Sequence, residues 1–249
     1  NSSLAAVIKS PGVPPTLDLF IKARQLNIPI LSEIELAYAF LKTPLIGVTG
    51  TNGKTTTTAL ITAILKEARI EPAIAAGNIG NPLAAIVGST SAQGFIVAEL
   101  SSFQLADINE FRPDIAVFLN FTEDHLDYHG GLESYLQAKA RIFENQTAGD
   151  IAVLNAGDPK VLELAEECRA RVLYFDRSPV SIGVGLEDEW MTIYKPGSES
   201  LKICRSSDLA LPGEHNLENA LAAATAAWAA GADPQSIAVA LKKFKAIEH

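Results

Sequence analysis

The segment that most constrains the fold joins a short apolar run to an amphipathic helix through a glycine-rich loop. Residues 45–48 predict a buried strand and residues 55–68 predict a helix. The apolar stripe of that helix comprises Leu60, Ile61, Ile64 and Leu65. The loop between strand and helix contains Gly50, Thr51, Asn52, Gly53, Lys54, Thr55 and Thr56. A strand, a glycine loop and a helix in this order indicate an α/β unit with backbone N–H groups converging at the helix N-terminus.

This loop has the chemistry of a phosphate cradle. Its glycines allow close approach of the backbone to an anion, Lys54 adds a mobile positive charge, and the Thr55 hydroxyl follows where a nucleotide-bound magnesium ion needs a ligand. The general phosphate-loop pattern has glycine at the position of Val48, whereas here Gly47 comes one residue too early. The alternative is a glycine-rich turn that only starts a helix.

Alternating apolar strands and helices continue along the chain. Further strands are predicted at 94–100, 114–120, 151–155 and 172–175, and further helices at 132–145, 159–168, 217–230 and after Asp233-Pro234. This order predicts an α/β fold with a mostly parallel sheet flanked by helices. Short alternating segments at 191–194 and 201–204, around Pro196-Gly197, predict a small antiparallel hairpin appended to that sheet.

Composition narrows the possible partners. The chain has 249 residues and a net charge of −9, which disfavours nucleic-acid binding by bulk electrostatics. Neither a membrane-spanning apolar run nor a signal peptide is visible. Cys168 and Cys204 have no spacing typical of a disulfide framework or metal site, so a cytoplasmic protein is expected. We also expect a monomer.

Two polar clusters follow predicted strands, at the sheet edge where open α/β sheets bind ligands. Glu99 is placed to bind magnesium near the phosphates, although Ser101 or Ser102 as an ordinary helix cap, with Glu99 solvated, also explains its cluster. The second cluster, at 122–127, contains His125 among carboxylates, and either a cation site or a surface loop accounts for it.

Four other polar residues have both a functional and an ordinary interpretation. Asn78 lies in a glycine-rich turn, and Lys139 would by default be a solvated helix lysine. Capping accounts for Asn216 at the start of the alanine-rich helix, whereas Asn219 lies inside the helix, where its low propensity needs another reason. From these residues alone, the sequence predicts an ATP- or GTP-dependent α/β enzyme.

Taken together, the motifs resemble those of the Mur ligases, ATP-dependent enzymes that add amino acids to the nucleotide-linked peptidoglycan precursor. The resemblance runs from about residue 10 to the last residue, through motifs at 50–55, 77–80, 99–104, 122–125, 135–141 and 215–219. The 99–104 and 77–80 motifs favour the branch that adds D-glutamate to UDP-N-acetylmuramoyl-L-alanine. The related folylpolyglutamate synthetases usually have glycine after the loop lysine, where this chain has Thr55, and this difference argues against that class.

The resemblance implies a role for each motif residue. The 50–56 loop would hold the phosphates of ATP, and Asn216 and Asn219 its adenine side. Magnesium would be bound by Thr55, Glu99, His125 and Lys139, the last as a carbamate formed with carbon dioxide. The residues implied to contact the UDP-muramoyl substrate are Ser10, Asn78, Ser101 and Gln104. The implied reaction proceeds through an acyl phosphate that the amine of D-glutamate attacks, with Lys54, Glu99, His125 and Lys139 as the catalytic set.

The resemblance also implies a division of the chain. Residues 1–43 would be a remnant of an N-terminal UDP-binding domain, and residues 44–249 the central ATP-binding domain. A third domain would supply the D-glutamate site, so we expect this chain to fold and bind nucleotide without completing the ligation. Two alternatives remain open: a Mur ligase that adds a different amino acid, and a non-catalytic nucleotide-binding module. A regulatory GTP switch is disfavoured because no Asn-Lys-x-Asp pattern occurs.

Overall fold

A computed structural model describes residues 4–14, 16–78, 80–89, 91–124 and 130–245. The described strands are β1 (Val7–Lys9), β2 (Ile30–Ser32), β3 (Leu45–Thr49), β4 (Ala73–Gly77), β5 (Phe95–Glu99), β6 (Ile115–Phe118), β7 (Ile151–Asn155), β8 (Arg171–Asp176), β9 (Gly183–Glu187), β10 (Trp190–Tyr194) and β11 (Leu201–Arg205). The described α-helices are α1 (Asp18–Gln25), α2 (Glu33–Tyr38), α3 (Lys54–Glu67), α4 (Leu83–Ile86), α5 (Ser102–Leu105), α7 (Leu132–Ala140), α8 (Pro159–Glu163), α9 (Glu214–Ala229) and α10 (Pro234–Lys243). Short 3-10 turns follow α4, α7, α8 and β11.

Within these described ranges, nine strands form one sheet in the order β11-β10-β9-β8-β7-β6-β3-β5-β4. Neighbouring strands from β4 to β9 are parallel, whereas β10 pairs antiparallel with both β9 and β11. β3 therefore lies between β5 and β6. From β3 the chain passes through α3 to β4, returns to β5 beside β3, and then crosses to β6 on the other side of β3. Such a reversal of strand order opens a crevice at the carboxyl ends of the strands. The loop after β3 lies at this point.

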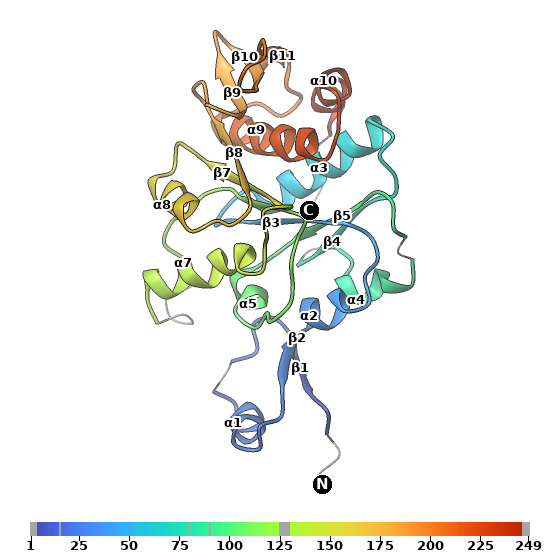
Figure 1. Cartoon of the computed structure of the whole chain (residues 1–249), viewed down its shortest axis with the longest axis vertical. Coiled ribbons are helices and arrows are strands. Elements are labelled where there is room, and N and C mark those ends of the chain that lie inside the picture. Colours follow the sequence, from blue (N-terminus) through green and yellow to red (C-terminus); the bar gives the residue numbers. More distant parts are fainter. Residues whose placement is uncertain (1–3, 15, 79, 90, 125–129, 246–249) are drawn as a thin grey trace.

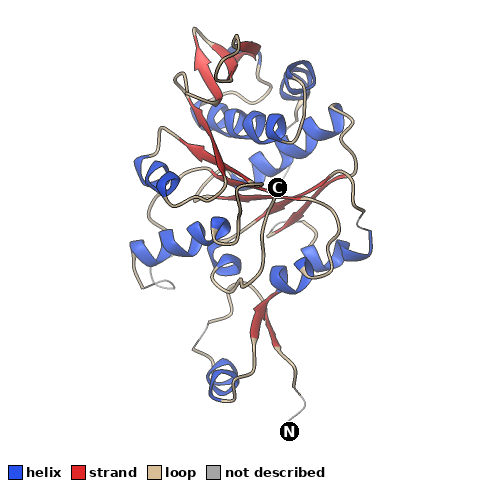
Figure 2. Ribbon diagram, in the orientation of Figure 1, coloured by secondary structure: helices blue, strands red, loops and turns tan. Residues whose placement is uncertain are grey.

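Helices cover both faces of the sheet, as Figures 1 and 2 show. Successive residues of a strand point to opposite faces, so Leu45 packs in one core and Ile46 in the other. One core contains the apolar faces of α3, α9 and α10, and the other contains those of α2, α4, α5, α7 and α8. Because both faces are covered, the central strands are apolar throughout: every residue of β3 is buried.

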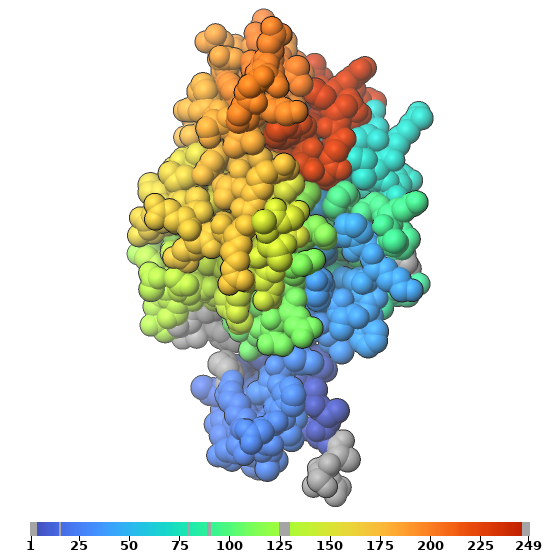
Figure 3. All heavy atoms as spheres, in the orientation of Figure 1, coloured from blue at the N-terminus to red at the C-terminus, as the bar shows by residue number. Residues whose placement is uncertain are grey.

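The described residues that precede α2 form a small unit at one end of the molecule. β1 and β2 pair in parallel as a separate two-stranded sheet, with α1 between them in the sequence. Figure 1 shows this unit beyond α2, and Figure 3 shows it as a narrow projection from a wider body. The predicted boundary at residue 44 lies at the start of the large sheet, but the division into two domains stays a prediction.

The predicted fold class is confirmed: a mostly parallel sheet is flanked by helices and carries an antiparallel part at one edge. The predicted hairpin corresponds to β10 and β11, and Asp233 caps α10 with Pro234 in its first turn, as expected. Two strands of the large sheet, β4 and β9, were not predicted. No helix within the described ranges has the length and apolar character needed to cross a bilayer.

Candidate functional site: a glycine–lysine loop with converging polar side chains

The loop between β3 and α3 is held in shape by the segment that follows β6. The Thr51 N–H donates to the Asn120 carbonyl at 3.0 Å, and the Asn52 N–H donates to Asn120 Oδ1 at 2.9 Å. Asn120 Nδ2 donates back to the Asn52 carbonyl at 3.1 Å. Gly53, at φ 83°, begins α3 without a side-chain cap. The N–H groups of the first helical turn are thus available to an anion at the positive end of the helix dipole.

Two lysines meet at one carbonyl oxygen of this loop. The Gly50 carbonyl accepts hydrogen bonds from Lys139 Nζ at 2.7 Å and from Lys54 Nζ at 3.1 Å. The pKa of Lys139 is lowered from 10.5 to about 7, mainly by burial and also by the charge of Lys54, while Asp124 opposes the shift. Burial also lowers the pKa of Lys54, against the opposing effect of Glu99 and Asp124. The interpretation of Lys139 as a solvated helix lysine is therefore wrong, because its side chain is 2% exposed.

Glu99 connects the helix after the loop to the neighbouring turn. Its Oε2 accepts a hydrogen bond from the Thr55 hydroxyl at 2.8 Å, and its Oε1 accepts one from Asn78 Nδ2 at 3.3 Å. The side chain is 3% exposed, so the alternative of a solvated Glu99 is wrong. The strand register brings Glu99 close to the loop of Lys54 and to the turn of Asn78, because Val48 and Gly77 both pair with Glu99 across adjacent parallel strands.

The residues expected to contact the muramoyl substrate lie in two places. Ser101 caps α5, and its hydroxyl and the Gln104 amide form a reciprocal capping box just after Glu99. Ser101 therefore does act as a helix cap, beside a buried Glu99. Ser10 is exposed, next to β1 in the small N-terminal unit.

The two asparagines of the alanine-rich helix have different surroundings. Asn219 lies against the loop: its Oδ1 accepts a hydrogen bond from Thr57 at 3.4 Å, and a Cβ atom on Gly53 would lie 2.1 Å from it. Asn216 donates to the Pro212 carbonyl at 2.8 Å from inside α9. The expectation that Asn216 caps this helix is wrong, because Gly213 is the N-cap residue.

The arrangement fits a nucleotide phosphate with a magnesium ion. Mg²⁺ is typically held by one or two carboxylates together with phosphate oxygens and waters, and Glu99 and the Thr55 hydroxyl supply such donors beside the uncapped helix. Within the described ranges, no group of three or more His, Cys, Asp or Glu side chains gathers around a metal position. His125 lies outside the described residues.

Sequence reasoning missed Asn120, and it included Asp124 only as one carboxylate of the 122–127 cluster, without an individual role. Asn120 shapes the loop through its side chain, and Asp124 affects the pKa of both site lysines. Their place after β6, beside β3, is the signal that could have identified them. The Tyr135 ring, whose centroid is 4.7 Å from Lys139 Nζ, was also missed.

Comparison with known proteins identifies the class that this fold and site define. Residues 48–227 match the model of the Mur ligase middle domain, and the chain belongs to the Mur ligase family. Among curated proteins, it is 46% identical over its whole length to UDP-N-acetylmuramoylalanine--D-glutamate ligase of Pelotomaculum thermopropionicum, and 44% identical over 98% of its length to the ligase of that name from Clostridioides difficile. It covers 54% of each relative, so the chain spans about half the length of the curated relatives it matches.

Solved structures support the same fold. The UDP-N-acetylmuramate:L-alanyl-gamma-D-glutamyl-meso-diaminopimelate ligase from Neisseria meningitides superposes with a TM-score of 0.69 at 20% identity, over 98% of this chain and 80% of that one. A MurF structure from Acinetobacter baumannii gives a TM-score of 0.65 at 19% identity, over 100% of this chain and 62% of the other. At such identities, the likeness concerns the fold.

Proposed function

We propose that this chain is the nucleotide-binding part of an ATP-dependent ligase that joins D-glutamate to UDP-N-acetylmuramoyl-L-alanine in peptidoglycan precursor synthesis. The observation that carries the proposal is the meeting of Thr55, Glu99 and Lys139 around the loop of Lys54. The names and identities of the curated relatives support the choice of D-glutamate. In this proposal residues 44–249 form the ATP-binding domain and residues 1–43 belong to a UDP-binding domain. The reaction would take place in the cytoplasm.

Each group has a task in this reaction. The 50–56 loop and the first turn of α3 would bind the ATP phosphates, with Lys54 turning from the loop carbonyls to the transferred group. Asn219, and Asn216 one turn earlier, would lie on the adenine side. Magnesium, held by Thr55, Glu99 and His125, would neutralise charge on the phosphates. The muramoyl substrate would be oriented by Ser10, Asn78, Ser101 and Gln104. Its carboxylate would then attack the γ-phosphate, and the amine of D-glutamate would displace phosphate from the acyl phosphate.

The role of Lys139 needs a different explanation, because burial and a neighbouring lysine both disfavour the protonated, cationic form of its amine. With a pKa of about 7, a large fraction of this amine is neutral at physiological pH and able to react with carbon dioxide. The resulting carbamate is an anion, which would suit the positive surroundings of Lys54 and a magnesium ion. We therefore include Lys139 among the metal-binding residues in this modified form.

The test uses a form extended to the full length of the relatives. Phosphate release is measured with ATP, the UDP-muramoyl-L-alanine substrate and each candidate amino acid in turn. We expect D-glutamate alone to support turnover, and E99Q and K139A each to lower kcat at least ~100-fold, as removal of a preorganised charge at a reacting centre does. Turnover with another amino acid would indicate a different Mur ligase. Ligation untouched by both variants would indicate a non-catalytic nucleotide-binding module.

Nucleotide binding is tested on the present chain. K54A should abolish binding of ATP in calorimetry, whereas K66A, which removes an exposed lysine from the end of the same helix, should leave it intact. Equal binding by the two variants would refute the role of the loop.

A further inference from the structure

A loop outside the nucleotide site is held by side chains from two separate parts of the chain, the N-terminal segment and the turn after α7. Residues 106–114 connect α5 to β6, and we call the first part of this connection, residues 106–111, the 106–111 loop. α5 has only four residues, too few to keep its orientation by helical hydrogen bonding alone. The orientation of Ser101 and Gln104 at its start therefore depends on how this loop is fixed.

From the N-terminal side, the loop is held by Glu35 of α2 and Lys9 of β1. The Glu35 carboxylate accepts three backbone N–H groups, those of Asn109 at 2.8 Å, Glu110 at 2.7 Å and Phe111 at 3.0 Å. It is 7% exposed, so these charge-assisted bonds replace its hydration. Lys9 forms an ion pair of 2.5 Å with Asp107.

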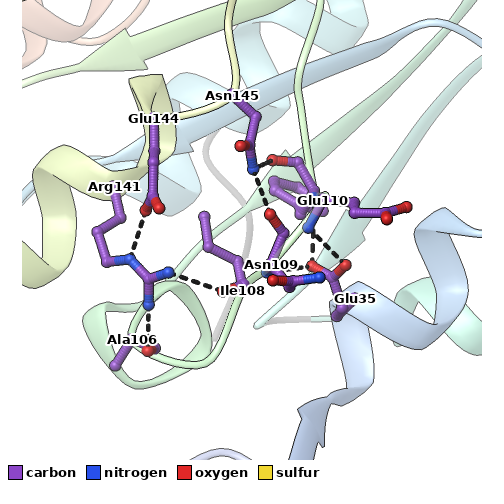
Figure 4. A network of polar contacts seen from close by, with 9 residues as sticks. Glu35, Ala106, Ile108, Asn109, Glu110, Arg141, Glu144 and Asn145 are labelled. Carbon is purple, nitrogen blue, oxygen red and sulfur yellow. Dashed lines mark hydrogen bonds and ion pairs between the residues drawn. The ribbon is translucent and has the colours of Figure 1, made fainter.

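From the other side, the loop is held by the turn that follows α7. The Arg141 guanidinium donates through Nη1 to the Ala106 carbonyl and through Nη2 to the Ile108 carbonyl, the latter at 2.7 Å. Asn145 Nδ2 donates to the carbonyls of Asn109 at 2.9 Å and Phe111 at 3.1 Å. Figure 4 shows Glu35 approaching from one side and Arg141 and Asn145 from the other.

These contacts connect three parts of the proposed site. Arg141 follows Lys139 by two residues, so its hydrogen bonds to the loop fix the end of the helix that carries Lys139. Glu35 and Lys9 belong to the first 43 residues, and Lys9 is next to Ser10. Except for the ion pair with Asp107, each of these polar contacts is made to the loop backbone. The side chains of Ile108 and Phe111 add burial in the core below the sheet.

We infer that Glu35 and Arg141 are positioning residues for the proposed ligation. Through the 106–111 loop, they set the turn that carries Ser101 and Gln104 against the helix that carries Lys139, and both against α2. This inference rests on the proposed function for its kinetic consequence, but the mechanical coupling itself does not.

Hydrogen exchange on the present chain tests the coupling without any substrate. The hydrogen bonds of the Glu35 carboxylate go to the 106–111 loop rather than to α7. E35Q should nevertheless raise amide exchange in α7 and α5 roughly tenfold, the scale expected for losing a hydrogen bond to a charged group. The matched control is D150N, which alters another buried carboxylate that accepts a backbone N–H, that of Thr147, and should leave α7 and α5 unchanged. An increase confined to residues 106–111 would overturn the inference.

Steady-state kinetics of the full-length form provide the second readout. E35Q and R141K should lower kcat/KM for the muramoyl substrate roughly ten- to hundredfold, as a small misplacement does, while the KM for ATP changes less than twofold. A purely structural role would lower only the amount of active enzyme, and an unchanged KM and kcat per folded molecule would refute positioning.

Two outcomes need separate treatment. If E35Q fails to fold, D107A replaces it in both measurements and is judged by the same criteria. It removes the ion pair between Asp107, which is 22% exposed, and the buried Lys9. If the wild type ligates no amino acid, the proposed function fails, and the exchange experiment alone decides whether the loop couples α2 to α7.

Discussion

The buried amine of Lys139 should make the stability of this protein depend on pH in a way that one substitution removes. Its pKa is about 7 in the folded chain and 10.5 when unperturbed. Below pH 7 both states are protonated, and the folded state carries the full cost of the buried charge. Between pH 7 and pH 10.5 the unfolded chain binds more protons, so stability rises with pH, and above pH 10.5 the cost is gone.

Since each pH unit in this window is worth about 1.4 kcal/mol, the cost at low pH is about 5 kcal/mol for a side chain that is 2% exposed. K139M replaces the amine with an apolar side chain of similar length. The stability advantage of K139M over the wild type should shrink by about 2 to 3 kcal/mol between pH 7.5 and pH 9.5. Urea unfolding in degassed buffer measures it, because degassing prevents carbamate formation.

K66M provides the control for removal of a lysine as such, because Lys66 is exposed on α3. The difference in free energy of unfolding between K66M and the wild type should not change over the same pH range. An equally flat difference for K139M, or one that grows with pH, would refute the argument that burial disfavours the charged amine.

Two further predictions concern the loop and the thiols. G53A should destabilise the chain by about 2 to 4 kcal/mol in thermal unfolding, because it places an alanine in a left-handed conformation and adds a clash with Asn219. The control, G197A, changes a glycine at φ 73° with free space around it and should cost only about 1 kcal/mol. Equal losses of stability in the two variants would contradict the clash. Burial raises the pKa of Cys168 and Cys204 to about 11, so an aromatic disulfide reagent at pH 7.5 should react slowly until urea is added; immediate reaction of both would show exposed thiolates.

The parts of the fold that were predicted from sequence are those with local signals. β3 and α3 followed from an apolar run and a helical stripe, and α10 from its Asp-Pro start. β4 was missed because its sequence, Ala-Ile-Ala-Ala-Gly, carries little of the β-branched or aromatic content that marks a strand. Pairing with β5 makes it a strand, and that pairing is not local information.

The same limit applies to the candidate site. The loop of Lys54 was found because its residues are consecutive. The burial of Lys139 was not predicted from the residues alone, because it depends on α7 lying over a loop 89 residues earlier in the chain. Asn120 and Glu35 were overlooked for a related reason. Both act on the backbone of distant segments, and such a contact leaves no pattern in the sequence around the residue that makes it.

The alanine-rich part of α9 has a consequence for how this sequence can vary. The α9 alanines that are at most 2% exposed are Ala220, Ala222, Ala223, Ala224, Ala226 and Ala227. α9 contacts α3 and α10 as well as β6, β7, β8 and β9 on one face of the sheet. Because α9 has neighbours on nearly every side, a larger side chain at one of these positions would displace the helix from the elements it packs against. In a random mutant library, the 220–227 stretch should therefore be among the most depleted in substitutions that add volume, although none of these alanines carries a reactive group.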